Sequence, residues 1–307
     1  MRHVRLFSLL LMLPLLTGCQ PLTPKELTAE VLPSPTAVAP LLAVHLVDEN
    51  AVVRMDIETY LAGVVAGEMP NTWPIEALKA QAILARTFVL KFVTEKDSRY
   101  PGADISTDIA EAQAYNADAI NERILTAVQE TAGQILLTED GSLPWPWFHS
   151  HSGGMTETAR HGIDWQDEEP AYVRATDGME TDSAPWSAHF TAAEFIAACR
   201  AAGAKVNTCE SVRIGQKGES GRAVTLLVDG ETVNAARLRI SLESTKMRST
   251  LLTELSVEGD IIRMSGLGYG HGVGLSQWGA HALAQRGWPA EEIALHYYKG
   301  LRVVKAW

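Results

Sequence analysis

One glutamate stands in an apolar stretch where it could donate a proton. The segment "AGVVAGEMPNTWPIEA" places Glu68 between Gly67 and Met69, at a point where we expect a helix to end. Apolar surroundings raise the pKa of a carboxyl, and such a group can act as a general acid near neutral pH. The alternative is an ordinary solvated loop glutamate with no chemical role.

An arginine interrupts the next predicted helix. After Pro74 the segment "IEALKAQAILARTFVLKFV" repeats apolar residues at steps of three and four, and further apolar residues cover most other faces. Arg86 therefore lies in a helix that we expect to be surrounded by protein, where an unpaired arginine is costly. The acidic residues nearby in the sequence that could pair with Arg86 are Glu58, Glu68 and Glu76.

Three histidines lie close together in "FHSHSGGMTETARHG". His149 and His151 would share one face of a strand, and with His161 they form a possible but weak metal set. The chain lacks HExxH and CxxC motifs, which weakens the case for zinc. It also lacks G-x-S-x-G, which argues against a serine hydrolase.

Glycine alternates with other residues in "GLGYGHGVGLSQWGAHALAQRG", residues 266–287. The spacing does not fit the dinucleotide pattern G-x-G-x-x-G, and no Lys-Ser/Thr follows for a phosphate loop. In an extended chain all five glycines would share one face, open to another backbone or to a flat ligand such as a sugar ring. The alternative is a tight strand crossing in the core, with His271 satisfied by a neighbour.

The overall composition limits the partners of the chain. It has 307 residues, 46 % of them apolar, and a formal net charge of −11. This size and apolar content suit one or two hydrophobic cores. The acidic balance argues against nucleic acid or an anionic membrane surface as the main partner.

The first residues are typical of an exported lipoprotein. "MRHVRLFSLLLMLPLLTGC" has a basic start, a short apolar run and small residues before Cys19. We predict a signal peptide over 1–18, lipidation of Cys19, and a Pro/Thr/Ala-rich tether over 19–41. A single domain would then span 42–307. In an oxidising compartment Cys199 and Cys209 could form a disulfide, or both could remain reduced core thiols.

The remaining pattern predicts an α+β fold. We expect mixed helices and mainly antiparallel strands in a single catalytic domain with an elongated cleft. The expected elements are short strands before a helix capped by Asp56, a helix over 117–132, strand–turn–strand units at Asp140-Gly141 and Asp229-Gly230, a helix over 276–286, and a helix between Pro289 and Gly300.

Four blocks of the sequence resemble the SpoIID/LytB family, named for stage II sporulation protein D and an enhancer of a cell-wall amidase. They span about residues 55–300 in the family's order. The blocks are "YLAGVVAGEMPNTWPIEALKAQAILARTF", "FHSHSGGMTETA", "ARLRISLESTKM" and "GLGYGHGVGLSQWGAHALAQRGWPAEEIALHYYKG".

The resemblance implies a peptidoglycan lytic transglycosylase. Such an enzyme cuts the MurNAc–GlcNAc bond of glycan strands, preferably those stripped of stem peptides, and leaves a 1,6-anhydro end. The glutamate of the family's E-M-P motif, Glu68 here, would be the general acid/base. The arginine of its R-T-[YF] motif, Arg86 here, would orient Glu68 or the substrate. Further candidates for contacts with the glycan are His149, Ser152, Tyr172, Tyr269, His271, Gln277 and Tyr298.

The family also implies partners. Its enhancer name gives the alternative function, a non-catalytic glycan-binding protein that stimulates a wall amidase. Some members bind zinc through a histidine and two cysteines, but this chain has no cysteine between Cys19 and Cys199. We therefore expect no cofactor, with the three histidines named above as the weak exception. The expected partners are glycan strands and a cell-wall amidase. The lipidated Cys19 predicted above implies a membrane-anchored position in the cell envelope, and Gln20, in place of an aspartate after the cysteine, indicates the outer membrane if the cell has one.

Overall fold

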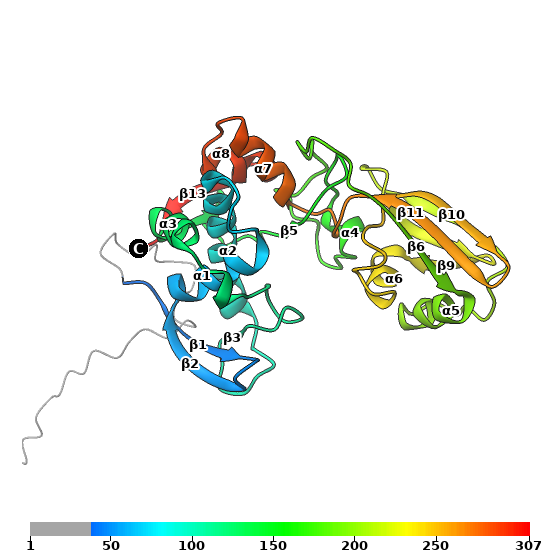
Figure 1. Ribbon diagram of the computed structural model, residues 1–307, viewed down its shortest axis with the longest axis horizontal. Helices are drawn as coiled ribbons and strands as arrows, with labels where there is room; N and C mark the ends of the chain where they lie inside the picture. The colour runs from blue at the N-terminus through cyan, green and yellow to red at the C-terminus, as the bar shows by residue number, and fades with distance from the viewer. Residues whose placement is uncertain (1–37) are drawn as a thin grey trace, which may run out of the picture.

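The computed structural model describes residues 38–307, which form an elongated molecule with two lobes (Figure 1). Within these residues the buried apolar side chains gather into two clusters, one in each lobe. Helices and small, mainly antiparallel sheets occur in both, so the predicted α+β class is confirmed. The elongated cleft and the single domain over 42–307 remain predictions.

The first lobe takes its elements from both ends of the described chain (Figure 1). Its early elements are β1 (Leu41–Leu46), β2 (Ala51–Asp56), α1 (Ile57–Glu68), α2 (Ile75–Glu95), β3 (Ile105–Ser106), the 3-10 turn η2 (Ala117–Ala119), α3 (Glu122–Glu130) and β4 (Gln134–Leu137). Its late elements are β12 (Leu275–Ser276), α7 (Gln277–Gln285), α8 (Ala290–Tyr297) and β13 (Arg302–Lys305).

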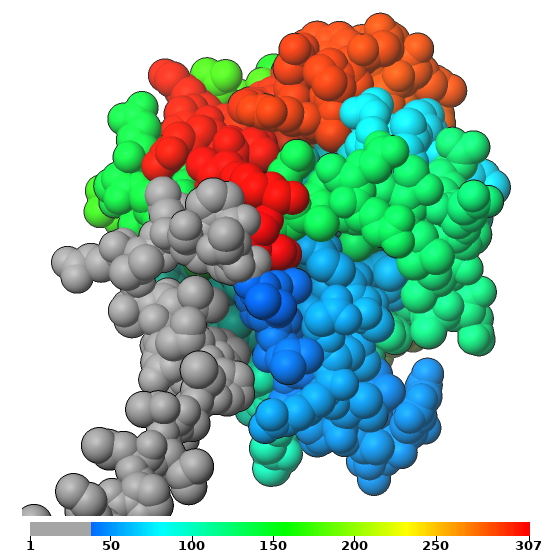
Figure 2. All heavy atoms as spheres, turned by 90° about the vertical axis from the view of Figure 1, so that its left-hand side faces the viewer, coloured from blue at the N-terminus to red at the C-terminus, as the bar shows by residue number. Residues whose placement is uncertain are grey.

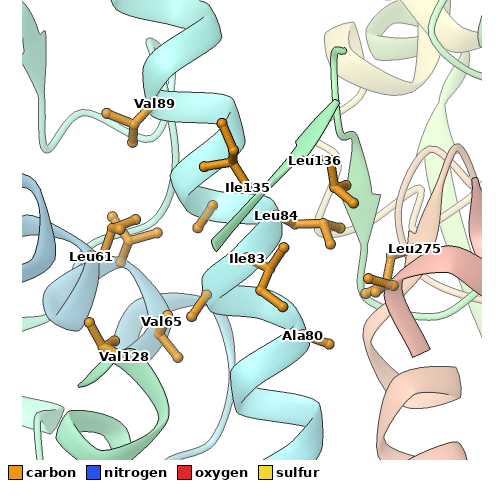
Figure 3. Packing of buried hydrophobic residues seen from close by; sticks show 14 of the residues in the cluster. Leu61, Val65, Ala80, Ile83, Leu84, Val89, Val128, Ile135, Leu136 and Leu275 are labelled. Carbon is orange, nitrogen blue, oxygen red and sulfur yellow. The ribbon is translucent and has the colours of Figure 1, made fainter. Parts of the chain in front are cut away.

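The long helix α2 is the centre of the first lobe. It contacts α1, α3, α7, α8 and β4, and side chains from most of its faces are buried, as the apolar pattern predicts. Figure 3 shows Ile83 and Leu84 of α2 among Leu61 and Val65 of α1 and neighbours from other elements. Burial of such side chains contributes roughly 1.5–3 kcal/mol each relative to exposure. A helix held this firmly can fix the position of its neighbour α1.

Strand pairing closes the first lobe across a long sequence separation. Antiparallel β13 pairs with β4, so that Arg302 lies opposite Leu137. Figure 2 shows the last residues (red) directly beside the first described strands (blue). The indole of Trp307 also donates to the Glu58 carboxylate of α1 at 3.1 Å. The first lobe is therefore complete only when residues 275–307 are in place.

The second lobe packs helices on two small antiparallel sheets. It comprises β6 (Pro185–Thr191), α5 (Ala192–Ala201), β7 (Val212–Lys217), β8 (Ala223–Val228), β9 (Glu231–Asn234), α6 (Ala235–Ser241), β10 (Leu252–Glu258) and β11 (Ile261–Leu267). The sheet orders are β7-β8-β9 and β10-β11-β6. The predicted turn between β8 and β9 is confirmed, because Asp229 and Gly230 both have positive φ, as a type I′ turn requires.

Two predicted elements differ from those observed. The helix expected over 117–132 is a 3-10 turn followed by α3, because Asn121 caps the backbone N–H of Ile124 and starts a new helix there. The strands flanking Asp140-Gly141 do not form a hairpin. Instead β4 pairs with β13, and the short β5 (Phe148–His149) pairs in parallel with β12.

The segment between the lobes is mostly irregular, with the short helix α4 (Ala159–Gly162). Among residues 38–307, no helix is both long and apolar enough to cross a membrane. The predicted signal peptide, lipidated Cys19 and nearly all of the tether lie outside the described residues.

Candidate active site

Glu68 is the last residue of α1, as the helix end predicted at the E-M-P motif requires. The helix begins at the expected cap, where the Asp56 carboxylate accepts the N–H of Thr59 at 3.0 Å. After Glu68 the chain turns extended at Met69, and Pro70 cannot continue the helix. These two local signals place Glu68 at a helix end in the first lobe.

Both oxygens of the Glu68 carboxyl accept hydrogen bonds from amide groups. Oε1 accepts the backbone N–H of Ala114 at 2.8 Å, and Oε2 accepts the side-chain amide of Gln277 at 3.2 Å. The Ala114 contact depends on Gly67, where an added Cβ would lie 2.7 Å from the backbone nitrogen of Tyr115. Gln277 opens α7, whose N-cap is Ser276. Three distant segments thus meet at one carboxyl.

The surroundings of Glu68 favour its protonated form. Burial raises the pKa of its carboxyl above the ordinary value, although the hydrogen bonds from Ala114 and Gln277 oppose part of that rise. Both of these partners are neutral. A carboxyl with a raised pKa is suited to deliver a proton and take one back.

Arg86 pairs with Glu58 rather than with Glu68 in the described part of the chain. Its Nε and Nη2 donate to the two oxygens of Glu58 at 3.0 and 2.6 Å, and its side chain has no exposed surface. Remaining donors reach the carbonyl oxygens of Ala82, Val128 and Gln134.

The physical reason for this pairing is position along α1. Glu58 lies in the first turn and Glu68 at the end, about 15 Å apart at the helical rise of about 1.5 Å per residue. Arg86 meets the first turn, so a direct contact with Glu68 is not available. The expected orientation of Glu68 by Arg86 is therefore corrected to an indirect one: Arg86 fixes the helix on which Glu68 stands.

The glycine run is not an extended strand, which corrects the sequence prediction. Strand β11 ends at Leu267, and four of the following glycines have positive φ: Gly268 (78°), Gly270 (113°), Gly272 (84°) and Gly274 (69°). L-residues rarely adopt these angles. Their bare sides face protein, and at Gly272 an added Cβ would lie 2.5 Å from the guanidinium of Arg222. The run packs tightly against the segment 147–153, in line with the alternative core interpretation.

The ring of His271, within this run, lies close to that of His149, with ring centroids 5.6 Å apart. His149 Nδ1 lies 3.1 Å from the carbonyl oxygen of Val273, and His271 Nδ1 accepts the N–H of the same residue at 3.0 Å. Burial lowers the pKa of both rings, that of His271 to about 3. Both are neutral at physiological pH.

Ser152 and His151 belong to neighbouring hydrogen-bond groups. Ser152 donates its hydroxyl to Glu180 at 2.8 Å, and Glu180 also accepts the hydroxyl of Ser276. His151 Nδ1 accepts the N–H of Gly153 at 3.0 Å, so its Nε2 donates to Asp182 at 2.9 Å. Ser152 is fully buried and takes a structural position here. The group around Glu180 supports the start of α7, and through it Gln277.

A second buried set of charges joins the second lobe to the segment between the lobes. Arg222, from the β7–β8 turn, donates to the carbonyl oxygens of Ser152 at 2.6 Å and Met155 at 2.9 Å. In return, Glu157 accepts the hydroxyl of Ser220 at 2.7 Å. Both charged side chains are fully buried, so these contacts hold the second lobe firmly against residues 152–157.

The predicted tyrosines lie in different settings. Tyr172 and Tyr298 are neighbours, with ring centroids 6.4 Å apart, and their hydroxyls bind backbone groups of Trp145 and Trp147. Burial raises the pKa of Tyr172 to about 12. Tyr269 instead lies half-buried under the guanidinium of Arg248, 5.5 Å from its ring centroid. Their proposed contacts with glycan stay predictions.

The histidines do not form a metal site in this geometry. His161 lies 3.6 Å from Glu157, while the other two histidines bind the groups described above. Among residues 38–307, no group of three or more His, Cys, Asp or Glu could hold a metal ion. The residues present therefore do not fit zinc, and the expectation that no cofactor is needed stays a prediction.

The two described cysteines are free buried thiols in the second lobe. Burial raises the pKa of Cys199 to about 12, with a smaller contribution from Cys209. A thiol with so high a pKa is unreactive. The described structure thus has the reduced alternative of the two that the sequence leaves open.

Several groups in or near the candidate site are not among the residues predicted from the sequence. The backbone N–H of Ala114 carries no side-chain signal and could not be found from residue types. Glu180 lay in a loop-rich stretch without a motif. Trp73 and Trp278 were findable, since the first follows the E-M-P motif and the second follows Gln277 directly.

Two regions of the chain match known protein families. Residues 47–137 match the family described as Stage II sporulation protein, and residues 166–274 match a domain of unknown function, DUF8618. The first match contains Glu58, Glu68 and Arg86, and the second contains the second lobe.

Three curated relatives align with most of the chain. Stage II sporulation protein D of Bacillus subtilis (strain 168) is 29% identical over 290 residues, covering 86% of this chain and 79% of the relative. An uncharacterized protein of Brachyspira hyodysenteriae is 29% identical over 256 residues, covering 82% of this chain and 67% of the relative. The amidase enhancer of Bacillus subtilis (strain 168) is 27% identical over 291 residues, covering 78% of this chain but 39% of the relative. The family match over residues 47–137 and these relatives support the resemblance of the chain to the SpoIID/LytB family.

Proposed function

We propose that the protein is a lytic transglycosylase that cuts the MurNAc–GlcNAc bond of peptidoglycan glycan strands, with Glu68 as its general acid/base. The observation that carries the proposal is the setting of Glu68: a partly buried carboxyl with a raised pKa, held by two neutral amide donors. The family's association with cell-wall degradation supplies the substrate class.

A single carboxyl is sufficient for this reaction. Glycosidases that use water generally employ two carboxylates, one of them to activate water or attack the sugar. An intramolecular nucleophile removes the need for a second carboxylate, and the 6-hydroxyl of the MurNAc ring is such a nucleophile.

In this reaction Glu68 donates a proton and later recovers one. Glu68 gives its proton to the glycosidic oxygen as the bond from that oxygen to C1 breaks. The 6-hydroxyl oxygen attacks C1 and its proton passes to the Glu68 carboxylate, which restores the acid. The products are a free GlcNAc hydroxyl and a 1,6-anhydroMurNAc end. No water is consumed and nothing is oxidised or reduced.

Mass spectrometry of products from denuded glycan strands tests the proposal. We expect anhydroMurNAc ends with the wild-type protein and a loss of at least about a hundredfold in their rate of formation with Glu68→Gln. Glu231→Gln, an exposed glutamate of the second lobe, is the matched control and should leave the rate unchanged.

A different outcome would select the other candidate function. The relative named amidase enhancer favours a non-catalytic protein that binds glycan and stimulates a wall amidase. Wild-type protein that releases no anhydro ends, yet accelerates digestion by an added N-acetylmuramoyl-L-alanine amidase, would replace the enzyme with this enhancer.

We also propose that the protein works at the cell envelope, held to the membrane by a lipid on Cys19. The relatives named for sporulation and for amidase enhancement support an envelope location. The lipid itself rests on the sequence of the first 19 residues. Mass spectrometry of the mature N-terminus should find a lipidated Cys19, and an unmodified N-terminus elsewhere would rule the anchor out.

A further inference from the structure

Three aromatic rings contact one another on the two segments that flank Glu68 and its partner Gln277. Trp278 is 42 % exposed and is the one aromatic residue among the large apolar side chains exposed within residues 38–307. Its ring meets that of Trp73 edge-on, with centroids 4.8 Å apart. His281 lies 4.8 Å from the Trp73 ring and 5.4 Å from the Trp278 ring. We call these three residues the aromatic platform.

The platform is built on the same segments that hold Glu68. Trp278 directly follows Gln277, whose amide binds the Glu68 carboxyl. Trp73 lies in the loop that leaves Glu68, five residues on. His281 stands one turn after Trp278 on the same face of α7. Continuity with the candidate acid therefore places the platform at the edge of the same site.

The platform is also rigid. Trp73 is 9 % exposed and belongs to the core of the first lobe. Its loop is tied to the segment before α3, because Asn71 donates to the carbonyl oxygen of Ala119 at 2.7 Å and accepts from Asn121 at 3.1 Å. The backbone N–H of Trp278 donates to the carbonyl oxygen of Ser150 at 3.0 Å. A ligand that covers the exposed ring of Trp278 therefore costs little conformational entropy in the protein.

The chemistry of the platform selects a neutral ligand with an apolar face. An indole presents a flat surface with a negative π face, which attracts the polarised C–H groups on one side of a sugar ring. Burial lowers the pKa of His281, so this ring is uncharged at neutral pH. A phosphate or carboxylate would find no cation in the platform. A neutral amino-sugar ring matches both the shape and the charge.

We propose that Trp278, braced by Trp73 and His281, stacks against one N-acetylhexosamine ring of the glycan strand next to the bond that Glu68 cleaves. This inference rests on the proposed function for the identity of its ligand. It assigns to Trp278 a substrate-binding role, separate from the proton transfer at Glu68.

Binding measured without turnover tests the stacking. Isothermal titration of denuded glycan strands into Glu68→Gln protein gives the reference Kd. Adding Trp278→Ala should raise Kd about tenfold or more, which corresponds to about 1.4 kcal/mol. Adding Trp278→Phe should restore most of the affinity, since the ring returns. Ile240→Ala, an exposed apolar residue of α6 in the second lobe, should leave Kd unchanged.

A further pair of variants tests the proposal even if the Trp278→Ala protein does not fold. Trp278→Leu keeps an apolar side chain without a π face, so it should bind glycan more weakly than Trp278→Phe even if Trp278→Ala is unstable. Equal Kd values for Trp278→Leu, Trp278→Phe and the unsubstituted Glu68→Gln protein would overturn the stacking proposal.

The same measurements separate the two proposals. If wild-type protein releases anhydro ends while Trp278→Ala binds and cleaves normally, the platform is wrong and the transglycosylase stands. If wild-type protein releases none but Trp278→Ala weakens glycan binding, the reaction is wrong and the platform stands. With both correct, Trp278→Ala raises KM with a smaller change in kcat, because it removes binding rather than proton transfer.

Discussion

The two ends of helix α1 carry glutamates in opposite chemical settings. Glu58, in the first turn, accepts two hydrogen bonds from the buried Arg86 guanidinium and one each from the Gly133 N–H and the Trp307 indole. Glu68, at the other end, accepts only amide hydrogen bonds among the described residues. Both side chains are largely shielded from solvent.

The difference separates a structural charge from a titratable acid. A cation beside a buried carboxylate stabilises its ionised form, so the Glu58 charge serves to hold α1, α2 and the chain's last residue together. Neutral donors stabilise the ionised form less than a cation does. At Glu68 the effect of burial is therefore larger than that of the hydrogen bonds, and the pKa of its carboxyl rises. Helix α1 thus carries both glutamates. The ion pair of Glu58 with Arg86 fixes the helix, and the helix in turn holds Glu68 in place.

The largest effect on stability is expected from breaking the Glu58–Arg86 ion pair. Glu58→Gln leaves the buried Arg86 charge without its partner, and the free energy of unfolding should fall by about 3–5 kcal/mol. Urea denaturation followed by circular dichroism measures this. The exposed Glu231→Gln variant is the control and should change little. A loss below about 1 kcal/mol for Glu58→Gln would mean that the pair does not anchor α1.

A double variant sharpens the same test. Arg86→Met alone should be as damaging as Glu58→Gln, since it leaves a buried carboxylate uncompensated. Glu58→Met with Arg86→Met removes both charges and should recover part of the loss. Recovery stays partial because the N–H groups of Gly133 and Trp307 then lose their acceptor.

A smaller effect is expected from the neutral donor at Glu68. Gln277→Leu removes a hydrogen bond that favours the ionised carboxylate, so the pKa of Glu68 should rise further. Since the acid must be protonated to act, activity falls as pH rises through this pKa, and the falling limb of kcat/KM should move to higher pH. Gln285→Leu, at the exposed far end of α7, is the matched control. An unshifted limb would show that the contact with Gln277 does not tune Glu68.

The smallest effect is a pH-dependent change in stability. The pKa of Glu68 is higher in the folded than in the unfolded chain, so its contribution to stability is present at low pH and is lost as pH rises through the folded pKa. Gln does not titrate. The stability of Glu68→Gln relative to wild type should therefore increase with pH, as urea titrations at several pH values can measure. A difference independent of pH would show that burial does not raise this pKa.

Features set by neighbouring residues could be predicted from the sequence. Asp56 caps α1 three residues before Thr59, and Asp229-Gly230 forms its hairpin turn, because both depend on local backbone geometry. The end of α1 at Glu68 follows from the adjacent proline for the same reason. Burial of α2 was predicted from its apolar periodicity.

Features set by distant residues could not be predicted in this way. Which glutamate contacts Arg86 depends on how α1 crosses α2. The apolar pattern does not indicate which turn of α1 lies against Arg86. Alternating glycines permit an extended strand and a run of positive φ equally well, and only the packing of residues 147–153 selects the second. The Ala114 N–H reaches Glu68 through backbone geometry that Gly67 allows.

The discontinuous first lobe has a consequence for biosynthesis. A nascent chain that has emerged only as far as Glu68 and Arg86 lacks Gln277, strand β13 and the Trp307 indole, all of which complete the surroundings of α1. The second lobe, which lies between them in sequence, must be synthesised before these contacts can form. On this arrangement a chain made only as far as Arg86 contains Glu68 but lacks the contacts that surround α1, and those contacts form only after residues 275–307 have been synthesised.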